Sequence, residues 1–307
     1  MKAVYFMKHG GPEVLQHGDL PDPVARLGEV VVDVHAASVN AADWKVRSGD
    51  YGPPLKKFPH ILGRDFSGVV SATGPGVKDL RIGDEVFGVC DVGQEGAYAE
   101  KIAIKAAIVT HKPPNRSHLE CAAVALTGLT ALVAIEDTLK LKAGQTILIL
   151  GGAGGVAGFA IQLAKYIGAR VISTTSTANI NYVLGLGADE VIDYTTQDFV
   201  RAAPRCDAVF DTVGGHVAMK AFEVLRSGGR AAFIATGDAP AAPRADVASL
   251  RPLVVRDRPH LVRIAELVAD AVVKAPKITM FPLADAARAH AISEARHLRG
   301  KLVLKVR

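Results

Sequence analysis

The stretch TILILGGAGGVAGFAIQLAK, residues 146–165, predicts a strand, a glycine turn and a helix in direct succession. Its first five residues form an unbroken apolar run with β-branched side chains, which is typical of a strand buried on both faces. Five glycines follow within residues 151–158, and after them Ala160, Ile161 and Ala164 share one helical face. This succession is the beginning of a parallel βαβ unit.

The glycine turn fits the pattern G-x-G-x-x-G/A, with Gly152, Gly154 and Ala157 in its three slots. A bound pyrophosphate needs backbone N–H donors at close range and the positive end of a helix dipole. A Cβ atom on Gly154 would stand between the backbone and that phosphate. The turn therefore predicts a dinucleotide site that includes Gly155 and Val156, and a purely structural glycine turn is the alternative.

Composition and charge narrow the class of protein. The 307 residues are enough for two domains with a large core. A net charge of +5 is spread along the chain and forms no basic block, so no nucleic-acid partner is indicated. No apolar stretch approaches the ~20 residues of a membrane span, and the N-terminus resembles a strand rather than a signal peptide. The three cysteines lack metal-ligand spacing and are typical of free thiols in a reducing cytoplasm.

The N-terminal part, residues 1 to about 115, predicts mostly β structure. Short apolar runs alternate with Gly and Pro turns, a pattern that suggests a partly open barrel. The runs lie at 30–34, 66–72, 82–88 and 96–103.

From about Ser117 the pattern changes to alternating helices and strands, which indicates a parallel, doubly wound sheet with right-handed crossovers. Strands are expected at 147–150, 170–174, 190–193, 208–211 and 230–235, and helices at 119–136, 156–167, 180–186, 196–202 and 217–225. A loop is expected at 237–248, then helices at 260–273 and 284–295 and a strand at 301–306. We expect the residues from 256 onward to return to the first domain.

With these pieces in place, the chain resembles the medium-chain dehydrogenase/reductase superfamily, and within it the zinc-free quinone oxidoreductase (zeta-crystallin-like) branch. The family's markers occur in order along the chain: Ala37-Ser38-Val39-Asn40-x-x-Asp43, Leu62-Gly63-Arg64-Asp65-x-x-Gly68-Val69-Val70, Gly83-Asp84-x-Val86-x-Gly88, Leu126-Thr127-x-Leu129-Thr130-Ala131, Gly154-Gly155-Val156, Leu186-Gly187-Ala188-Asp189 and Gly300-Lys301. The resemblance implies an α/β fold in which a GroES-like, mostly-β catalytic domain (1–116 plus 256–307) carries an inserted doubly wound (Rossmann) nucleotide-binding domain (117–255).

Three residues at the positions of the family's metal ligands argue against zinc. The zinc-dependent relatives carry a cysteine where this chain has Asn40, and His-Glu where it has Arg64 and Asp65. Catalytic zinc needs three protein ligands, among which thiolate or imidazole usually dominates. His35 and His60 lie nearby in the sequence and keep a metal site as the alternative, whereas surface or hydrogen-bonded histidines are the plainer interpretation. Without such a Lewis acid, reduction of quinones or α,β-unsaturated carbonyls by direct hydride transfer is favoured.

The segment that follows the glycine turn indicates NADPH. NAD sites usually place an acidic residue about 20 residues past the turn, but none occurs from Gly151 to Ala188. Its absence leaves room for a 2′-phosphate, to which Ser176 and Thr177 offer hydroxyl groups. Strand propensity is the alternative reason for this Ser/Thr run.

The resemblance adds two contacts at the 2′-phosphate end of the cofactor, Tyr194 and Arg296. It also exposes a departure, because Ala178 stands where relatives often carry Arg or Lys. Arg251 or Arg256 is the alternative basic partner.

At the reaction centre, the resemblance places Asn40 and Thr130 beside the nicotinamide. Ligands of parallel sheets sit at the carboxyl ends of the strands; the residues at two such ends are Val213, Gly214, Ile234 and Ala235. Hydride transfer needs no protein acid or base, but a developing enolate or quinol oxygen needs a donor.

The first candidate donor is Lys45, which stands where several quinone reductases have a substrate-contacting tyrosine; a solvated loop lysine is the alternative. Asp43 is the second candidate, with ordering of its loop as its plainer role. Trp44 and Tyr51 are expected to line the substrate cleft, unless Trp44 belongs to the core.

We therefore expect a cytoplasmic, NADPH-dependent, zinc-free enzyme that reduces quinones or activated C=C bonds. The alternatives are a zinc-free alcohol dehydrogenase or enoyl reductase for one metabolite, and a non-catalytic NADPH-binding sensor or RNA-associated protein. Relatives are often homodimers or homotetramers paired through an edge strand of the nucleotide domain, for which 208–211 and 230–235 are the candidates.

Overall fold

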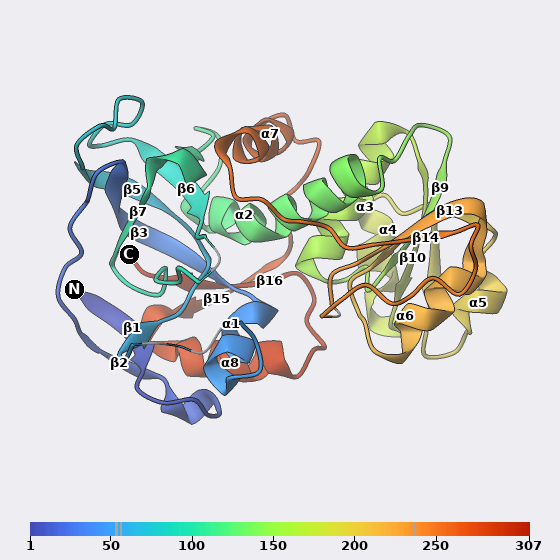
Figure 1. Ribbon diagram of the computed structural model, residues 1–307, viewed down its shortest axis with the longest axis horizontal. Helices are drawn as coiled ribbons and strands as arrows, with labels where there is room; N and C mark the ends of the chain where they lie inside the picture. The colour runs from blue at the N-terminus through green and yellow to red at the C-terminus, as the bar shows by residue number, and fades with distance from the viewer. Residues whose placement is uncertain (53–54, 56, 92, 236) are drawn as a thin grey trace. The chain divides into compact units, whose positions relative to one another are not determined.

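The computed structural model describes residues 1–52, 55, 57–91, 93–235 and 237–307. The chain divides into two compact units (Figure 1). Unit 1 comprises Met1–Leu126, Arg256–Asp270 and Ala275–Arg307, and unit 2 comprises Thr127–Val255 and Ala271–Lys274.

Unit 2 is built on a six-stranded parallel sheet in the order β11-β10-β9-β12-β13-β14. Its strands are β9 (Thr146–Leu150), β10 (Arg170–Thr175), β11 (Glu190–Asp193), β12 (Cys206–Asp211), β13 (Leu225–Phe233) and β14 (Ala248–Leu250). The chain runs outward from β9 in one direction to β11 and then in the other direction from β12. This reversal beside β9 is the switch point of a doubly wound sheet, so the expected Rossmann architecture is confirmed.

Helices cover both faces of this sheet because the strands are apolar on both faces. They are α3 (Gly155–Ile167), α4 (Ile180–Gly185), α5 (Phe199–Ala202) and α6 (His216–Lys220), which continues into the 3-10 turn η5 (Ala221–Val224). Leu148 and Leu150 of β9 share a buried cluster with Phe199 and Phe222. Figure 1 shows α3 on one side of the sheet and α5 and α6 on the other.

The strands expected to form an edge of the sheet lie in its interior. Both β12 and β13 have a neighbour on each side, whereas β11 and β14 are the outer strands. The three-residue strand β14 begins at Ala248, the last residue of the expected loop at 237–248, and it is too short to give an apolar pattern of its own.

Unit 1 contains the mostly-β part of the chain. Its main sheet has the order β15-β16-β3-β5-β6-β8, with β7 paired to β3. The strands are β3 (Glu29–Val39), β5 (Asp65–Thr73), β6 (Glu85–Val89), β7 (Lys101–Lys105), β8 (Val109–His111), β15 (Ile278–Pro282) and β16 (Lys301–Lys305). A small sheet joins β2 (Gln16–Asp19), β1 (Lys2–Phe6) and β4 (His60–Ile61). Because β16 pairs antiparallel with β3, the end of the chain completes the sheet that its beginning started.

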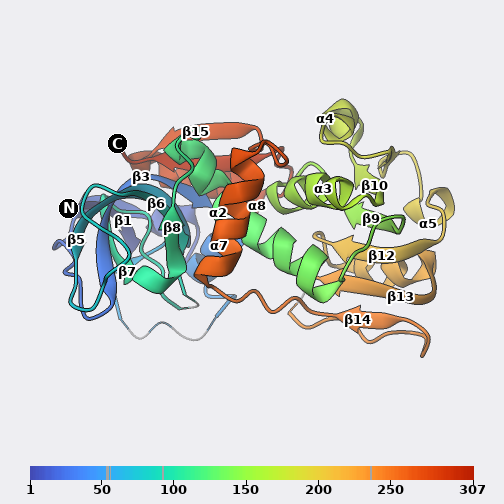
Figure 2. The ribbon, with the colours of Figure 1, turned by 90° about the horizontal axis from the view of Figure 1, so that it is seen from above.

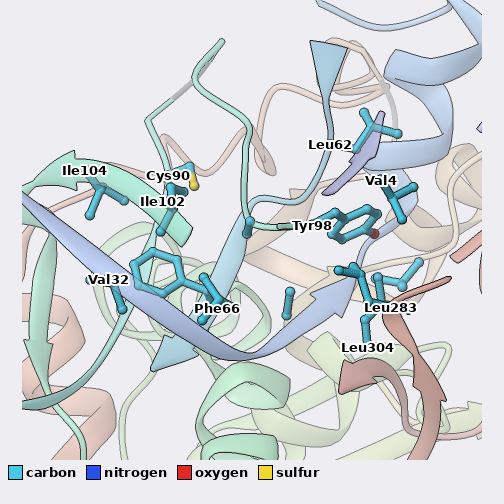
Figure 3. Close-up of a cluster of buried hydrophobic side chains, with 14 of the residues drawn as sticks. Val4, Val32, Leu62, Phe66, Cys90, Tyr98, Ile102, Ile104, Leu283 and Leu304 are labelled. Carbon is cyan, nitrogen blue, oxygen red and sulfur yellow. The ribbon is translucent and has the colours of Figure 1, made fainter. Parts of the chain in front are cut away.

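The core of unit 1 lies inside the curved main sheet. Phe66, Tyr98 and Ile104 are fully buried there, together with Leu304 from the end of the chain. Figure 3 shows these side chains, which come from segments that are far apart in the sequence. Unit 1 also holds the helices α1 (Ala41–Ser48), α7 (Arg258–Ala269) and α8 (Ala286–Glu294).

The sequence analysis did not predict helix α1. Its N-cap is Asn40, whose side chain and that of Asp43 form a capping box with the backbone of the first turn. The pattern Asn-x-x-Asp before the apolar Trp44 is a variant of the capping-box signature, and it would have revealed the helix.

The helix α2 (His118–Leu132) continues as a π-helical turn over Val133–Thr138 and is drawn as one ribbon in Figure 2. Together they form a 21-residue helix that is long and apolar enough to cross a membrane, contrary to our expectation that no stretch approaches this length. However, 78% of its most apolar window is buried inside the protein, as in a core helix. Ala122 and Ala123 pack against Ala36 of β3 and Val303 of β16.

Candidate cofactor and substrate sites

The glycine turn between β9 and α3 has two glycines that are required for different reasons. A Cβ atom on Gly152 would lie 2.3 Å from the Ser173 hydroxyl of β10, so this glycine allows the turn to pack on the neighbouring strand. A Cβ atom on Gly154 would meet nothing closer than the Gly151 carbonyl oxygen, at 3.4 Å. Gly154 is the N-cap of α3, and the first N–H groups of a helix have no partner within the helix. The turn therefore presents donors to open space, as an anion site requires.

The parallel sheet brings most of the sequence-predicted cofactor residues to one edge. Strand ends lie side by side, because Leu150 pairs with Thr174 and Asp211, and Asp211 pairs with Phe233. At this carboxyl edge lie Gly152, Gly154, Gly155, Val156, Ser176, Thr177, Tyr194, Val213, Gly214, Ile234 and Ala235. Thr130, also in unit 2, lies on α2 and is half-buried.

Asp211 is a residue of this edge that sequence reasoning missed. Its buried carboxylate accepts hydrogen bonds from the backbone N–H groups of Val213, at 2.8 Å, and Gly214, at 3.0 Å. Burial raises the pKa of Asp211, and these hydrogen bonds oppose the rise. The side chain thereby fixes the tight turn after β12, in which Gly214 has a φ of 72°.

Asp193 is a second missed residue, and it bears on the choice of cofactor. The Thr177 hydroxyl donates to its carboxylate at 2.5 Å, and the backbone N–H and hydroxyl of Thr195 donate at 3.0 and 2.7 Å. These hydrogen bonds lower the pKa of Asp193. The segment after the glycine turn has no acid of its own, but strand β11 brings an ionised carboxylate to Thr177. The hydroxyl proton of Thr177 is therefore already used within the protein.

In unit 1, the Asn40 cluster consists of Ser38, Asn40, Asp65 and Lys301, all of them buried. The Lys301 ammonium donates to Asn40 Oδ1 at 2.5 Å, and Asn40 Nδ2 donates to Asp65 Oδ1 at 2.8 Å. The Ser38 hydroxyl also donates to Asp65, at 2.7 Å. Burial lowers the pKa of Lys301 and raises that of Asp65, and their mutual attraction opposes both shifts.

The two buried charges fix the orientation of the Asn40 amide. If the amide were reversed, its NH₂ group would face the ammonium of Lys301 and its oxygen would face the carboxylate of Asp65. Both contacts would be repulsive in a buried environment. Asn40 thus stands between an ammonium and a carboxylate in one orientation only, set by residues of β16 and β5.

A second buried chain of hydrogen bonds, the Asp43 chain, joins α1 to α8. Arg47 Nη1 lies 3.2 Å from His290 Nδ1, His290 Nε2 lies 3.3 Å from the Tyr98 hydroxyl, and this hydroxyl donates to Asp43 Oδ2 at 2.9 Å. A guanidinium only donates, so His290 accepts at Nδ1 and donates from Nε2. Burial lowers the pKa of His290 to about 3 and raises that of Asp43 to about 6.

The two histidines that kept a metal site open have other neighbours. His60 Nε2 lies 3.4 Å from Glu95, which also accepts from Arg64 Nη2 at 2.8 Å. The ring of His35 stacks on that of His118, with centroids 4.4 Å apart. Among the described residues, no group of three or more His, Cys, Asp or Glu side chains could hold a metal ion.

The remaining predicted residues lie around the ring of Trp44 in unit 1. Lys45 is half-buried, and its Nζ lies 5.6 Å from the ring centroid. Arg296, which follows α8, has its guanidinium carbon 5.7 Å from the same centroid. Trp44 itself is only 8% exposed, so it belongs to the core rather than to an open cleft wall.

Comparisons with known proteins match this architecture over the whole chain. Residues 26–114 match the family model described as the alcohol dehydrogenase GroES-like domain, and residues 186–304 match the one described as zinc-binding dehydrogenase. The NADPH-dependent alkenal/one oxidoreductase of Arabidopsis thaliana chloroplasts is 32% identical over 99% of this chain and 79% of that protein. The chain belongs to the medium-chain dehydrogenase/reductase family.

Two solved structures place the chain more closely within this family. A quinone oxidoreductase from Coxiella burnetii superposes with a TM-score of 0.94 at 35% identity, over 100% of this chain and 99% of that one. An NAD-dependent alcohol dehydrogenase superposes with a TM-score of 0.92 at 33% identity, over the full length of both chains. This medium-chain dehydrogenase/reductase is an oxidoreductase of the zinc-free quinone oxidoreductase type.

Proposed function

We propose that this medium-chain dehydrogenase/reductase uses NADPH to reduce quinones or α,β-unsaturated carbonyls by direct hydride transfer. The observation that carries the proposal is the glycine turn at the carboxyl edge of the unit 2 sheet, with donors of α3 facing open space at Gly154. The relatives are a quinone oxidoreductase and an alkenal/one oxidoreductase by name, and these names supply the class of acceptor.

When bound, NADPH supplies the hydride. The chain's own residues bind the cofactor, orient it and stabilise the negative charge that develops on the substrate. The glycine turn and the first turn of α3 would hold the pyrophosphate. Asn40, with its amide fixed by Lys301 and Asp65, would bind the nicotinamide ribose or carboxamide in one orientation. Lys45 would donate a hydrogen bond to the oxygen on which negative charge develops.

NADPH, rather than NADH, is favoured by Ser176 and Tyr194, which follow β10 and β11. Arg296, the basic contact that the resemblance implies, lies beside Trp44 in unit 1 and is not counted among these residues. Asp193 opposes this preference, because its ionised carboxylate lies at Thr177 and would repel a 2′-phosphate. We therefore propose a preference for NADPH that is weaker than an arginine at position 178 would give.

A second candidate function is alcohol oxidation with NAD. Two observations favour it: the likeness to an NAD-dependent alcohol dehydrogenase and the position of Asp193. Product analysis separates the two functions, because reduction of an enone at C=C gives a saturated ketone and reduction at C=O gives an allylic alcohol.

The deciding experiment follows the absorbance of NADPH and, separately, of NADH against a naphthoquinone, an enone, an aldehyde and no acceptor. Faster oxidation of NADPH with the quinone or the enone is the expected result, and it should survive dialysis against a chelator. Turnover with the aldehyde alone, or activity that zinc restores after chelation, contradicts the proposal. Bound NADPH without any turnover would leave the sensor function in its place.

We further propose that the enzyme is a cytoplasmic homodimer or homotetramer. The outer strand β14 is followed by Leu253 and Val255, which are 78% and 55% exposed, and pairing along this edge would cover them. The three cysteines are free and buried, as suits a reducing compartment. Light scattering on the purified protein tests the assembly; a monomer at all concentrations would exclude it.

A further inference from the structure

Helix α1 and the turn after it carry two aromatic rings, and cations lie beside both. The Arg64 guanidinium carbon is 5.3 Å from the ring centroid of Tyr51. Lys45 and Arg296 lie at 5.6 and 5.7 Å from the ring centroid of Trp44. Attraction to a ring face holds a cation in place but does not neutralise it.

The cation beside Tyr51 has anionic partners. Arg64 Nη2 donates to Glu95 Oε1 at 2.8 Å, and its Nε lies 3.8 Å from Asp43 Oδ1. Arg64 is therefore part of a paired, buried structure. Arg64 therefore shows how a cation of this region is paired when acidic side chains of the protein neutralise its charge.

The two cations beside Trp44, Lys45 and Arg296, differ from Arg64 because they have no anionic partner among the described residues. Within the part of the chain that the structure describes, the side chains of Lys45 and Arg296 make no hydrogen bond and no ion pair. Three acids near them along the chain are already engaged: Asp43 accepts from the Tyr98 hydroxyl, Asp50 accepts from Ser48, and Glu294 pairs with Arg47. Burial lowers the pKa of Lys45, and the positive charge of Arg296 lowers it further.

The positive charges of Lys45 and Arg296 repel each other, and Lys45 is half-buried whereas Arg296 is exposed. An anion between them would remove this repulsion. A guanidinium offers a planar fork to a carboxylate or phosphate, and an ammonium adds a compact point charge. The arrangement is therefore complementary to an oxyanion, and binding one would relieve the repulsion between the two cations.

We propose that Lys45 and Arg296 form a subsite, supported by Trp44, for an oxyanion carried by the substrate. The proposal rests on the function proposed above and narrows it: the preferred acceptors are quinones or enones that bear a carboxylate or a phosphate. Lys45 then binds the substrate's charged group, in addition to or in place of the oxygen at the reacting centre.

The sequence provides a direct probe, because Trp44 is the single tryptophan of the chain. Its fluorescence in the cofactor-free protein is titrated with 4-oxo-2-pentenoate, with the neutral analogue 3-penten-2-one, and with inorganic phosphate and acetate. A saturable change with the charged enone, absent with the neutral one, is expected. Stronger saturation with phosphate than with acetate would identify a phosphate site, and the reverse a carboxylate site.

Matched variants decide whether the response comes from these two cations. Arg296→Met and Lys45→Met should each abolish saturation, Arg296→Lys should retain part of it, and Lys78→Met, which removes an exposed lysine between β5 and β6, should leave it unchanged. An identical response of the neutral enone, or saturation retained in the double Met variant, refutes the subsite.

Steady-state kinetics connects the subsite to catalysis. The preference of the enzyme for the charged enone over the neutral one, expressed as the ratio of their kcat/KM values, should fall by about tenfold in Arg296→Met, as expected for one lost charge-assisted contact. A ratio near one in the parent enzyme would refute selection of acidic substrates. If neither enone is turned over but the fluorescence still saturates, the proposed function fails while the anion subsite stands.

Discussion

The glycine turn of unit 2 and the Asn40 cluster of unit 1 are built from different parts of the polypeptide. The turn uses backbone N–H groups, and its essential residues, Gly152 and Gly154, lie within one short stretch. The cluster uses buried side chains, and its members come from β3, the N-cap of α1, β5 and β16. The backbone site costs little stability, because glycine buries no charge.

The difference determines how each site tolerates change. Replacing a glycine adds a side chain, and its effect on stability or binding depends on which atoms lie next to the new Cβ. Replacing a buried charge leaves its partner unpaired, which is costly wherever it occurs. The glycine turn should therefore fail by losing its ligand, and the Asn40 cluster by losing the fold around it.

The largest effect is expected from Lys301→Met. The change removes the positive charge that opposes the raised pKa of the buried Asp65, and it leaves Asn40 Oδ1 without its donor. Leaving a buried charge without compensation costs about 3–5 kcal/mol of unfolding free energy. Urea denaturation measures the loss. Lys305→Met, on the exposed end of the same strand, is the control and should change stability little. Equal stability of both variants would show that the cluster carries no buried charge.

Next in size is the effect of Gly154→Val on the cofactor. We expect NADPH affinity to fall by about 100-fold, because the side chain would displace charge-assisted hydrogen bonds of about 1.5–3 kcal/mol each. Thermal stability should change little. Gly152→Val is the counterpart and should lower stability, because its Cβ would lie 2.3 Å from Ser173 Oγ. Calorimetric titration and thermal melts separate the two outcomes, and unchanged affinity in Gly154→Val would move the pyrophosphate elsewhere.

The pH dependence of the unfolding free energy tests the cost of another buried charge in unit 1, the carboxylate of Asp43. Its folded pKa of about 6 lies above the ordinary value of 3.8, so the folded state binds more protons than the unfolded state between about pH 4 and pH 6. Stability from this group therefore falls as the pH rises through that window, by about 2–3 kcal/mol at 1.36 kcal/mol per pKa unit.

Asp43→Asn should remove this loss, so the variant gains stability relative to the parent as the pH rises from 4 to 6. His118 and His290 act in the opposite direction, because their pKa values are lowered to about 4 and about 3. Their contribution cancels when the variant is compared with the parent by denaturation at each pH. A constant difference between the two proteins would contradict a raised pKa for Asp43.

The smallest effect is expected from Asp193→Asn at the cofactor edge. Removing the negative charge beside Thr177 should raise the preference for NADPH over NADH, measured as a ratio of kcat/KM values, by about two- to fivefold, which corresponds to a single weak charge–charge interaction. Asp198→Asn, an N-cap further along the chain, provides a matched charge change away from Thr177. A lower ratio in Asp193→Asn would mean that Asp193 supports the 2′-phosphate site by holding Thr177.

Sequence reasoning was strongest where a function depends on consecutive residues. The strand, turn and helix of 146–165 appear as β9 and α3, and the cofactor residues that follow β9 to β13 share one edge of the sheet. It failed for the short or irregular elements α1, β14 and β15. It also failed for the edge strands, because the order of strands in a sheet depends on long-range pairing and not on local sequence patterns. Whether the residues gathered at this edge bind NADPH stays a prediction.

By itself, the sequence determined the succession of helices and strands in unit 2 and the glycine turn, since periodicity and glycine geometry act over a few neighbouring residues. The tertiary structure alone decided the partners of the buried polar side chains. Lys301 meets Asn40, His290 meets Tyr98 and Asp193 meets Thr177 across long separations in the chain. A buried charge is stable only beside a specific partner, and the fold, not the local sequence, brings that partner to it.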